Sequence, residues 1–273
     1  NFSPADWYDV LLAGPKRDEQ IEYLKKVIDN VGKAGIPAFG YNFSLAGVWG
    51  HQKKHAARGG AVSTCFDASL VDVDAHIPNG QVWNMTYAPW DGGYMPSVTY
   101  EEIWDRLKYF LERVLPAAEE GGVELALHPD DPPMPSLRGT PRVVYRPELY
   151  KKLIDLVPSS ANKLELCLGS LQEMQSDRPI YDYLDQYIAQ DKISYVHFRN
   201  VKGKVPCYDE VFVDEGDIDM FRVLKQLRDG GFQGVLIPDH TPLVTCGAPW
   251  HAGMAFALGY MRAAFQMMEK GIF

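Results

Sequence analysis

Apolar residues first recur at helical spacing over residues 18–34. Ile21, Leu24 and Ile28 lie three and four residues apart, which predicts an amphipathic helix over this range. The next apolar run, residues 36–42, is short and is typical of a buried strand. The first two elements expected are therefore a helix and a strand that follows it.

The pattern breaks over residues 43–98, where turn residues are dense. Gly59-Gly60, Pro78-Asn79-Gly80 and Asp91-Gly92-Gly93 predict a long loop-rich insertion with room for one short hairpin. A loop of this length inside a compact domain is usually functional, often as a lid over a site. A disordered insertion is the alternative, and the aromatic residues of this stretch count against it.

A regular alternation begins at Thr99. Thr99 and Glu102 have the spacing of a capping box and open a long helix. Short apolar strands then alternate with helices: strands at 123–128, 164–168, 193–198 and 235–238, and helices at 147–156, 181–190, 218–228 and 253–270. This order indicates an α/β fold with a parallel sheet covered by helices, as one domain over residues 1–273.

Four consecutive predicted strands end in a side chain that can bind a metal ion. These side chains are His128, Cys167, His197 and Asp239. Because the carboxyl ends of parallel strands meet at one edge of a sheet or barrel, we expect the four to converge. Two imidazoles, one thiolate and one carboxylate can together bind a divalent metal ion.

Each of these residues also has a purely structural interpretation. A single buried cysteine such as Cys167 is usually a small hydrophobic residue. A histidine at the end of a strand is usually held by hydrogen bonds, and Asp239 alone is compatible with a helix cap or a turn. We favour the metal site because the same register recurs on four strands in succession.

Three further residues could take part in chemistry at this edge. Arg199 lies two residues beyond His197 on the same face and could bind a substrate carboxylate through two hydrogen bonds, with a salt bridge to Asp130 or Glu165 as the alternative. His240 follows Asp239 and is a candidate general acid or base, or else contacts a helix. His251 is a second candidate acid or base, with a helix-cap role as the alternative.

Net charge and cysteine content limit which binding partners and which cell compartment are expected. The net charge is −9, with 36 acidic against 27 basic residues, so a nucleic-acid or anionic-membrane partner is not expected. The four cysteines have no CxxC pair and no regular spacing, which suits a reducing cytoplasm. No apolar stretch reaches the length of a transmembrane helix. A small-molecule substrate is the remaining expectation.

The motifs, taken together and in order, resemble those of the mannonate dehydratases. They are His128-Pro-Asp-Asp-Pro-Pro133, Cys167, His197-Phe-Arg-Asn200 and Pro238-Asp-His240. That family consists of metal-dependent sugar-acid dehydratases with a TIM (β/α)₈-type barrel of the xylose-isomerase-like kind. The resemblance implies that His128, Cys167, His197 and Asp239 are metal ligands, with manganese the most common ion and iron, nickel or zinc as alternatives.

The resemblance also implies roles for residues around the metal. Arg199 falls where the family holds the substrate carboxylate, and His240 falls on a catalytic histidine. Asn42, where the resemblance begins, and Asp130 are further substrate-binding candidates. The family's catalytic tyrosine is absent from the loop at residues 241–253, where His251 is the candidate for its place.

The expected reaction is dehydration of D-mannonate to 2-keto-3-deoxy-D-gluconate and water. A base removes the C2 proton and an acid protonates the departing C3 hydroxyl. A metal-dependent sugar isomerase or epimerase of the same fold is one alternative, and a non-catalytic sugar-acid binding protein is another.

Only five strands are convincing in this sequence, whereas a closed barrel has eight. We therefore expect a barrel whose first strands precede Asn1. The open edge of such a sheet would be covered by another segment or subunit, so a homo-oligomer is expected.

Overall fold

The structure is a computed structural model that describes residues 4–272. Residues 1–3 and 273, which the predicted domain includes, lie outside the described residues. The chain forms two compact units: Asn1–Trp49 with Val71–Glu165, and Gly50–Leu70 with Leu166–Phe273. The division falls within β9 (Asn162–Cys167). A single domain over the whole chain stays a prediction.

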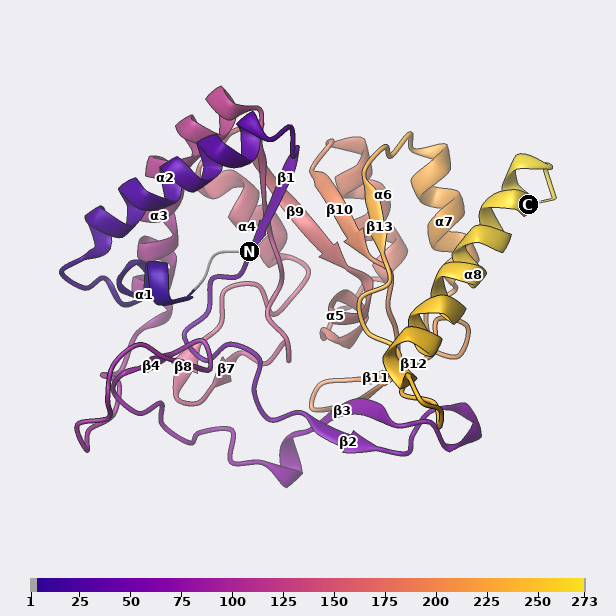
Figure 1. The fold of residues 1–273 in the computed structure, drawn as a ribbon, viewed down its shortest axis with the longest axis horizontal. Coiled ribbons are helices and arrows are strands. Elements are labelled where there is room, and N and C mark those ends of the chain that lie inside the picture. Colours follow the sequence, from indigo (N-terminus) through magenta and orange to yellow (C-terminus); the bar gives the residue numbers. More distant parts are fainter. Residues whose placement is uncertain (1–3, 273) are drawn as a thin grey trace. The chain divides into compact units, whose positions relative to one another are not determined.

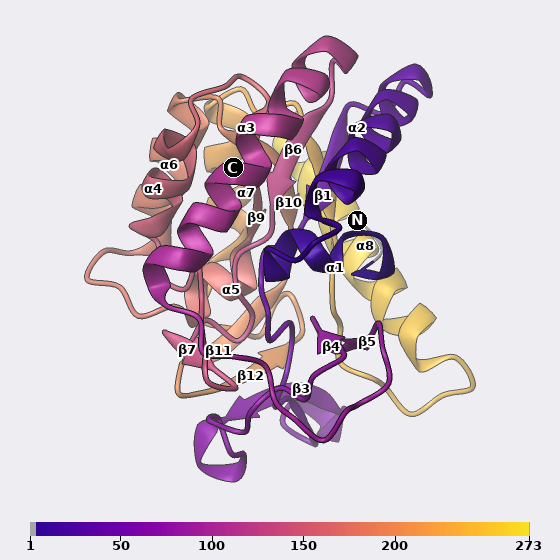
Figure 2. The same ribbon diagram turned by 90° about the vertical axis from the view of Figure 1, so that its left-hand side faces the viewer.

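The first unit combines helices with short parallel strands (Figure 1). Its helices are α1 (Pro4–Leu12), α2 (Arg17–Lys33), α3 (Tyr100–Gly121) and α4 (Leu149–Leu156). Its strands are β1 (Ala38–Tyr41), β4 (Gln81–Val82), β5 (Met85–Thr86), β6 (Glu124–Leu127), β7 (Ser136–Leu137), β8 (Thr140–Pro141) and the first part of β9. Helix α2 packs along α3, as Figure 2 also shows. The capping box is confirmed at the start of α3, where Thr99 and Glu102 bond to each other's backbone N–H.

Strands β1 and β6 end level with each other, and β9 pairs along the other side of β6. Strand β1 is parallel to β6, with Tyr41 opposite Leu127, and β6 is parallel to β9. The backbone N–H of His128 donates to Tyr41 O at 2.9 Å, which extends the pairing to the residue after β6. The side chains that follow β1 and β6 therefore leave the sheet at the same level.

An aromatic cluster forms the core beneath this edge. The ring of Phe110 in α3 contacts the rings of Trp7, Tyr41 and Phe43, with centroids 5.6–5.9 Å apart. All four side chains are buried. The cluster joins α1 and α3 to the end of β1, which fixes the backbone that leads into Asn42.

The second unit adds an antiparallel sheet to the strand–helix pattern. Its helices are η1 (Arg58–Gly60), η2 (Ala68–Leu70), α5 (Leu168–Glu173), α6 (Ile180–Ala189), α7 (Met220–Asp229) and α8 (Pro249–Glu269). Its strands are β2 (Gln52–Lys54), β3 (Ser63–Asp67), the end of β9, β10 (Ile193–His197), β11 (Asn200–Lys204), β12 (Cys207–Val211) and β13 (Val235–Ile237). Strands β11, β12, β3 and β2 follow one another in the antiparallel sheet.

Most of the insertion at residues 43–98 is irregular, as expected, but it forms two hairpins rather than one. Strands β2 and β3 make the first, and β4 and β5 make the second. The hairpin formed by β11 and β12 lies outside this insertion and was not predicted. Its strands carry many polar residues, so they lack the apolar alternation that indicates a strand.

The five predicted parallel strands are all present within residues 4–272. They belong to one sheet in the order β1-β6-β9-β10-β13. The pairings of β1 with β6, β6 with β9, and β10 with β13 are parallel. Within the part of the chain that the structure describes, none of the helices has the length and apolar character needed to cross a membrane.

Candidate active site

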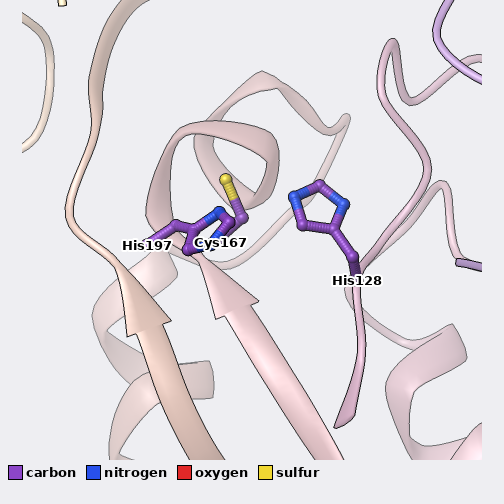
Figure 3. Close-up of side chains that lie close together, drawn as sticks. All are labelled: His128, Cys167 and His197. Atoms are coloured by element: carbon purple, nitrogen blue, oxygen red, sulfur yellow. The ribbon is translucent and has the colours of Figure 1, made fainter. Parts of the chain in front are cut away.

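Cys167 and His197 lie together at the ends of neighbouring strands in the second unit. Cys167 is the last residue of β9 and also the N-cap of α5, and His197 is the last residue of β10. The Cys167 Sγ and a ring nitrogen of His197 lie within 4.8 Å of each other (Figure 3). Two soft or borderline ligands therefore meet at this edge.

The sulfur of Cys167 accepts hydrogen bonds from two N–H donors. The Ser170 backbone N–H lies 3.5 Å away, and the Arg199 Nη2 lies 3.3 Å away. Both donors favour a negatively charged sulfur, since a thiolate accepts N–H groups more strongly than a thiol does. Cys167 is thus in a polar setting suited to a metal-binding thiolate, rather than in the apolar setting of a small hydrophobic residue.

Arg199 is fully buried among protein acceptors, which differs from our expectation. Its Nη1 lies 2.5 Å from Glu210 Oε1 and 3.2 Å from Glu173 Oε1, and its Nε lies 3.3 Å from Asp239 Oδ2. Its side chain is 0% exposed. We predicted a substrate carboxylate as its partner, with Asp130 or Glu165 as the alternative. Because three other carboxylates surround it, the structure does not support Arg199 as a carboxylate clamp.

Asp239 is placed directly beside His197 after β13. Its Oδ2 lies 3.5 Å from His197 Nδ1 and 3.3 Å from Arg199 Nε. Burial alone would raise the pKa of this carboxyl, but the hydrogen bond from His197 and the charge of Arg199 outweigh burial and lower its pKa. Asp239 is therefore ionised, as a metal ligand must be.

His240 is held by a buried carboxylate that the sequence did not reveal. Its Nδ1 lies 2.8 Å from Glu210 Oε2, and its Nε2 lies 3.5 Å from Asp239 Oδ1. Burial lowers the pKa of His240, whereas the hydrogen bond and charge of Glu210 raise it, and the net direction is upward. The side chain is 41% exposed, so this imidazole can meet a substrate.

His251 lies in a different environment from His240. We expected it in a loop before the last helix, but α8 begins earlier, with Pro249 at its first position, so His251 sits in the first turn. Its side chain is exposed. Its catalytic role stays a prediction.

His128 and Asn42 line one small cavity in the first unit. This cavity, about 10 Å³ in volume, is also lined by Trp83 and Asp131. The Nδ1 of His128 lies 2.6 Å from Pro129 O, and its Nε2 lies 3.7 Å from Glu165 Oε1. A carbonyl only accepts, so Nδ1 carries a proton, and in the neutral form of the ring the lone pair lies on Nε2. That is the form a metal ligand needs.

Asp130 has a structural role in this unit. Its Oδ2 accepts the backbone N–H groups of Val143 and Val144, and its Oδ1 lies 2.9 Å from Arg142 Nε. Arg142 in turn donates to Ser44 Oγ and to the backbone carbonyl of Gly47. We predicted that Asp130 binds substrate, but its carboxylate is engaged in holding these loops around the cavity.

Sequence reasoning missed two carboxylates of the second unit, Glu173 and Glu210. Their side chains are only 0% and 4% exposed, respectively. For Glu210 a signal was present, because two acidic residues, Asp209 and Glu210, lie among the apolar residues of the stretch 208–213. For Glu173 the sequence has no comparable signal, since α5 is a single short helix after β9.

Comparison with known proteins places the chain in a family. The family model for D-mannonate dehydratase (UxuA) matches residues 5–270. Mannonate dehydratase from Streptococcus pneumoniae (strain 70585) is 33% identical over 243 residues, covering 85% of this chain and 66% of that protein. The mannonate dehydratase from Geobacillus thermodenitrificans (strain NG80-2) is 31% identical, and the match covers 86% of this chain and 68% of that protein. The chain thus spans about two thirds of the length of these curated relatives.

Solved structures agree on the fold. The crystal structure of mannonate dehydratase from Streptococcus suis serotype 2 matches with a TM-score of 0.81 and 30% identity, over 96% of this chain and 74% of that one. A xylose isomerase domain protein from Planctomyces limnophilus matches with a TM-score of 0.52 and 14% identity. This match covers 95% of this chain and 71% of that one. The predicted α/β class and the xylose-isomerase-like barrel type are confirmed.

Proposed function

Because the chain belongs to the D-mannonate dehydratase family, we propose that it dehydrates a sugar acid, D-mannonate, to 2-keto-3-deoxy-D-gluconate and water. The observation that carries the proposal is the geometry around Cys167. A thiolate-favouring cysteine, His197 and the ionised Asp239 gather at the strand ends, and His240 lies beside Asp239. This set combines ligands for a metal ion with an acid–base group.

We propose that His128, Cys167 and His197 bind a divalent metal ion, with Asp239 as a fourth ligand (Figure 3). Two imidazoles, a thiolate and a carboxylate suit manganese, iron, nickel or zinc, and manganese is our first choice. A bound ion supplies positive charge that stabilises the negative charge developing on the substrate carboxylate when the C2 proton leaves.

The protein's own acid–base groups complete the elimination. We propose that one of His240 and His251 acts as the base that removes the C2 proton. The other acts as the acid that protonates the departing C3 hydroxyl. The electrons of the broken C2–H bond form the C2=C3 double bond as the C3–O bond breaks. The hydroxyl departs with one added proton as water, and the resulting enol becomes the 2-keto acid.

The other residues position these groups and the substrate. Arg199 contacts Cys167, Glu210 and Asp239, so we assign it to holding the ligands and the acid–base group in place. We keep Asn42 as a substrate-binding residue, because it lines the same small cavity as His128. A cavity of this size accepts a single water-sized group, such as one hydroxyl of a sugar acid.

An assay with several substrates tests the activity. Purified protein is incubated with manganese and D-mannonate, then with other hexonates and with neutral sugars, and 2-keto-3-deoxy acid is measured. We expect product from D-mannonate. Isomerised neutral sugar would instead indicate an isomerase or epimerase, and binding of a sugar acid without turnover would indicate a non-catalytic protein.

We also propose a cytoplasmic homo-oligomer that binds no nucleic acid. Exposed apolar side chains on β13 and α8 favour self-association, including Val235 at 61% and Leu258 at 51% exposure. The four cysteines form no disulfide within residues 4–272, as suits a reducing compartment. Light scattering after gel filtration should give a mass above the 30.7 kDa of one chain.

A further inference from the structure

Glu210 divides its carboxylate between a cation and a catalytic candidate. Its Oε1 lies 2.5 Å from Arg199 Nη1, and its Oε2 lies 2.8 Å from His240 Nδ1. The residue is only 3% exposed. We propose that Glu210 is a positioning residue that fixes the ring orientation and tautomer of His240. This inference rests on the proposed function, which makes His240 an acid–base group.

The chemistry of the contact determines which nitrogen carries the proton. An ionised carboxylate only accepts hydrogen bonds, so His240 Nδ1 must donate to Glu210. In the neutral imidazole the lone pair then resides on Nε2. Nε2 is thus the atom that exchanges protons with the substrate. The contact with Glu210 leaves the lone pair on Nε2, where it can accept a proton.

The fold holds Glu210 rigidly enough for this task. It lies in β12, where it is paired with Val201 of β11. On its other side β12 pairs with β3, where Asp209 lies opposite Cys65. The segment Gly50–Leu70, which looked like a loop in the sequence, therefore supports the strand that carries Glu210.

Loss of the carboxylate would favour the opposite tautomer. The Nε2 of His240 lies 3.5 Å from Asp239 Oδ1, which is also an acceptor. In Glu210→Gln the amide carbonyl would turn to Arg199 and the amide N–H₂ to His240, because Arg199 only donates. His240 Nδ1 would then accept, and the ring proton would move to Nε2. Such a ring can no longer act as a base at Nε2.

Glu173 provides a matched control. It pairs with the same nitrogen of Arg199, at 3.2 Å, and it is also fully buried. Glu173→Gln therefore removes one negative charge beside Arg199, as Glu210→Gln does, and leaves the contact between Glu210 and His240 intact. If the tautomer of His240 changed only because Arg199 had lost one neighbouring negative charge, the change would appear in both variants.

The test is ¹⁵N NMR of the histidine rings in the full chain without metal, at an alkaline pH where each neutral ring carries one proton. His240 is assigned by comparison with His240→Asn. We expect the proton on Nδ1 in the wild type and in Glu173→Gln, and on Nε2 in Glu210→Gln. Glu210→Asp keeps the charge but shortens the side chain, so we expect a folded protein with mixed tautomers. An unchanged Nδ1 proton in Glu210→Gln, or in Glu210→Asp if the former does not fold, would overturn the proposal.

Kinetics provide the second measurement. We expect Glu210→Gln to lower kcat on the order of 10–100-fold, as for residues that orient a reactive group. The KM should change by less than about threefold, because the proposal assigns Glu210 to His240 and Arg199 rather than to the substrate. If the wild type dehydrates no hexonate, the proposed function fails while the NMR result still decides the role of Glu210. If the wild type is active and the variant keeps its kcat, Glu210 is not a positioning residue.

Discussion

The Nη2 of Arg199 lies 3.3 Å from the Sγ of Cys167, so a fully buried cation donates directly to a proposed metal ligand. The same guanidinium contacts the carboxylates of Glu173, Glu210 and Asp239. One arginine thus balances three acidic groups and a thiolate at the ends of the strands. These contacts hold the guanidinium in a fixed position beside the proposed metal ligands.

Replacing Arg199 with methionine should destabilise the fold strongly. The variant leaves buried carboxylates without their cation, which typically costs about 3–5 kcal/mol of unfolding free energy. Urea denaturation at neutral pH measures the loss. Lys33→Met is the control, because Lys33 pairs with Asp29 on the surface, with side chains 71% and 51% exposed. The unfolding free energy of the Lys33→Met variant should differ from that of the wild type by less than about 1 kcal/mol. Equal stabilities for the two variants would contradict the role given to Arg199.

Replacing Cys167 with serine should remove bound metal. A hydroxyl is a poorer ligand than a thiolate for manganese, iron, nickel or zinc at neutral pH, so we expect metal affinity to fall on the order of 10–100-fold or more. Elemental analysis of purified protein gives metal content, and activity should fall in parallel. Cys207→Ser is the control, because Cys207 is exposed. Normal metal content in Cys167→Ser would exclude Cys167 from the site.

The parallel strands and most helices could be predicted because their apolar positions repeat at a regular period. The histidines and Cys167 could be predicted as candidates because they end those strands. The partners of Arg199 could not be predicted in the same way. Glu210 reaches it from a polar hairpin that is stabilised by pairing with β3, some 140 residues earlier in the sequence. Local periodicity carries no information about such long-range register.

The four thiols should differ sharply in reactivity. Cys207 and Cys246 are exposed and should be alkylated within minutes, whereas Cys65 and Cys167 are buried. Burial raises the pKa of Cys65 to about 12, with the nearby Asp209 adding to the shift. At pH 8 its thiolate fraction is therefore on the order of 10⁻⁴. Mass spectrometry of peptides after timed alkylation identifies each site. Fast labelling of Cys65 in the native protein would contradict this environment.

The capping box of α3 should give the fold a pH-dependent contribution. The Thr99 backbone N–H, followed by its hydroxyl, lowers the pKa of Glu102. Since the folded pKa lies below the unfolded one, the stabilisation is complete above the unfolded value of about 4.3 and is lost as the pH falls through the folded value. Glu102→Gln keeps a capping-box side chain without the charge. Its unfolding free energy should be lower than that of the wild type at pH 7, and the gap should narrow as the pH falls below the unfolded value. A gap that is constant over this range would show that the charge of Glu102 does not stabilise the helix.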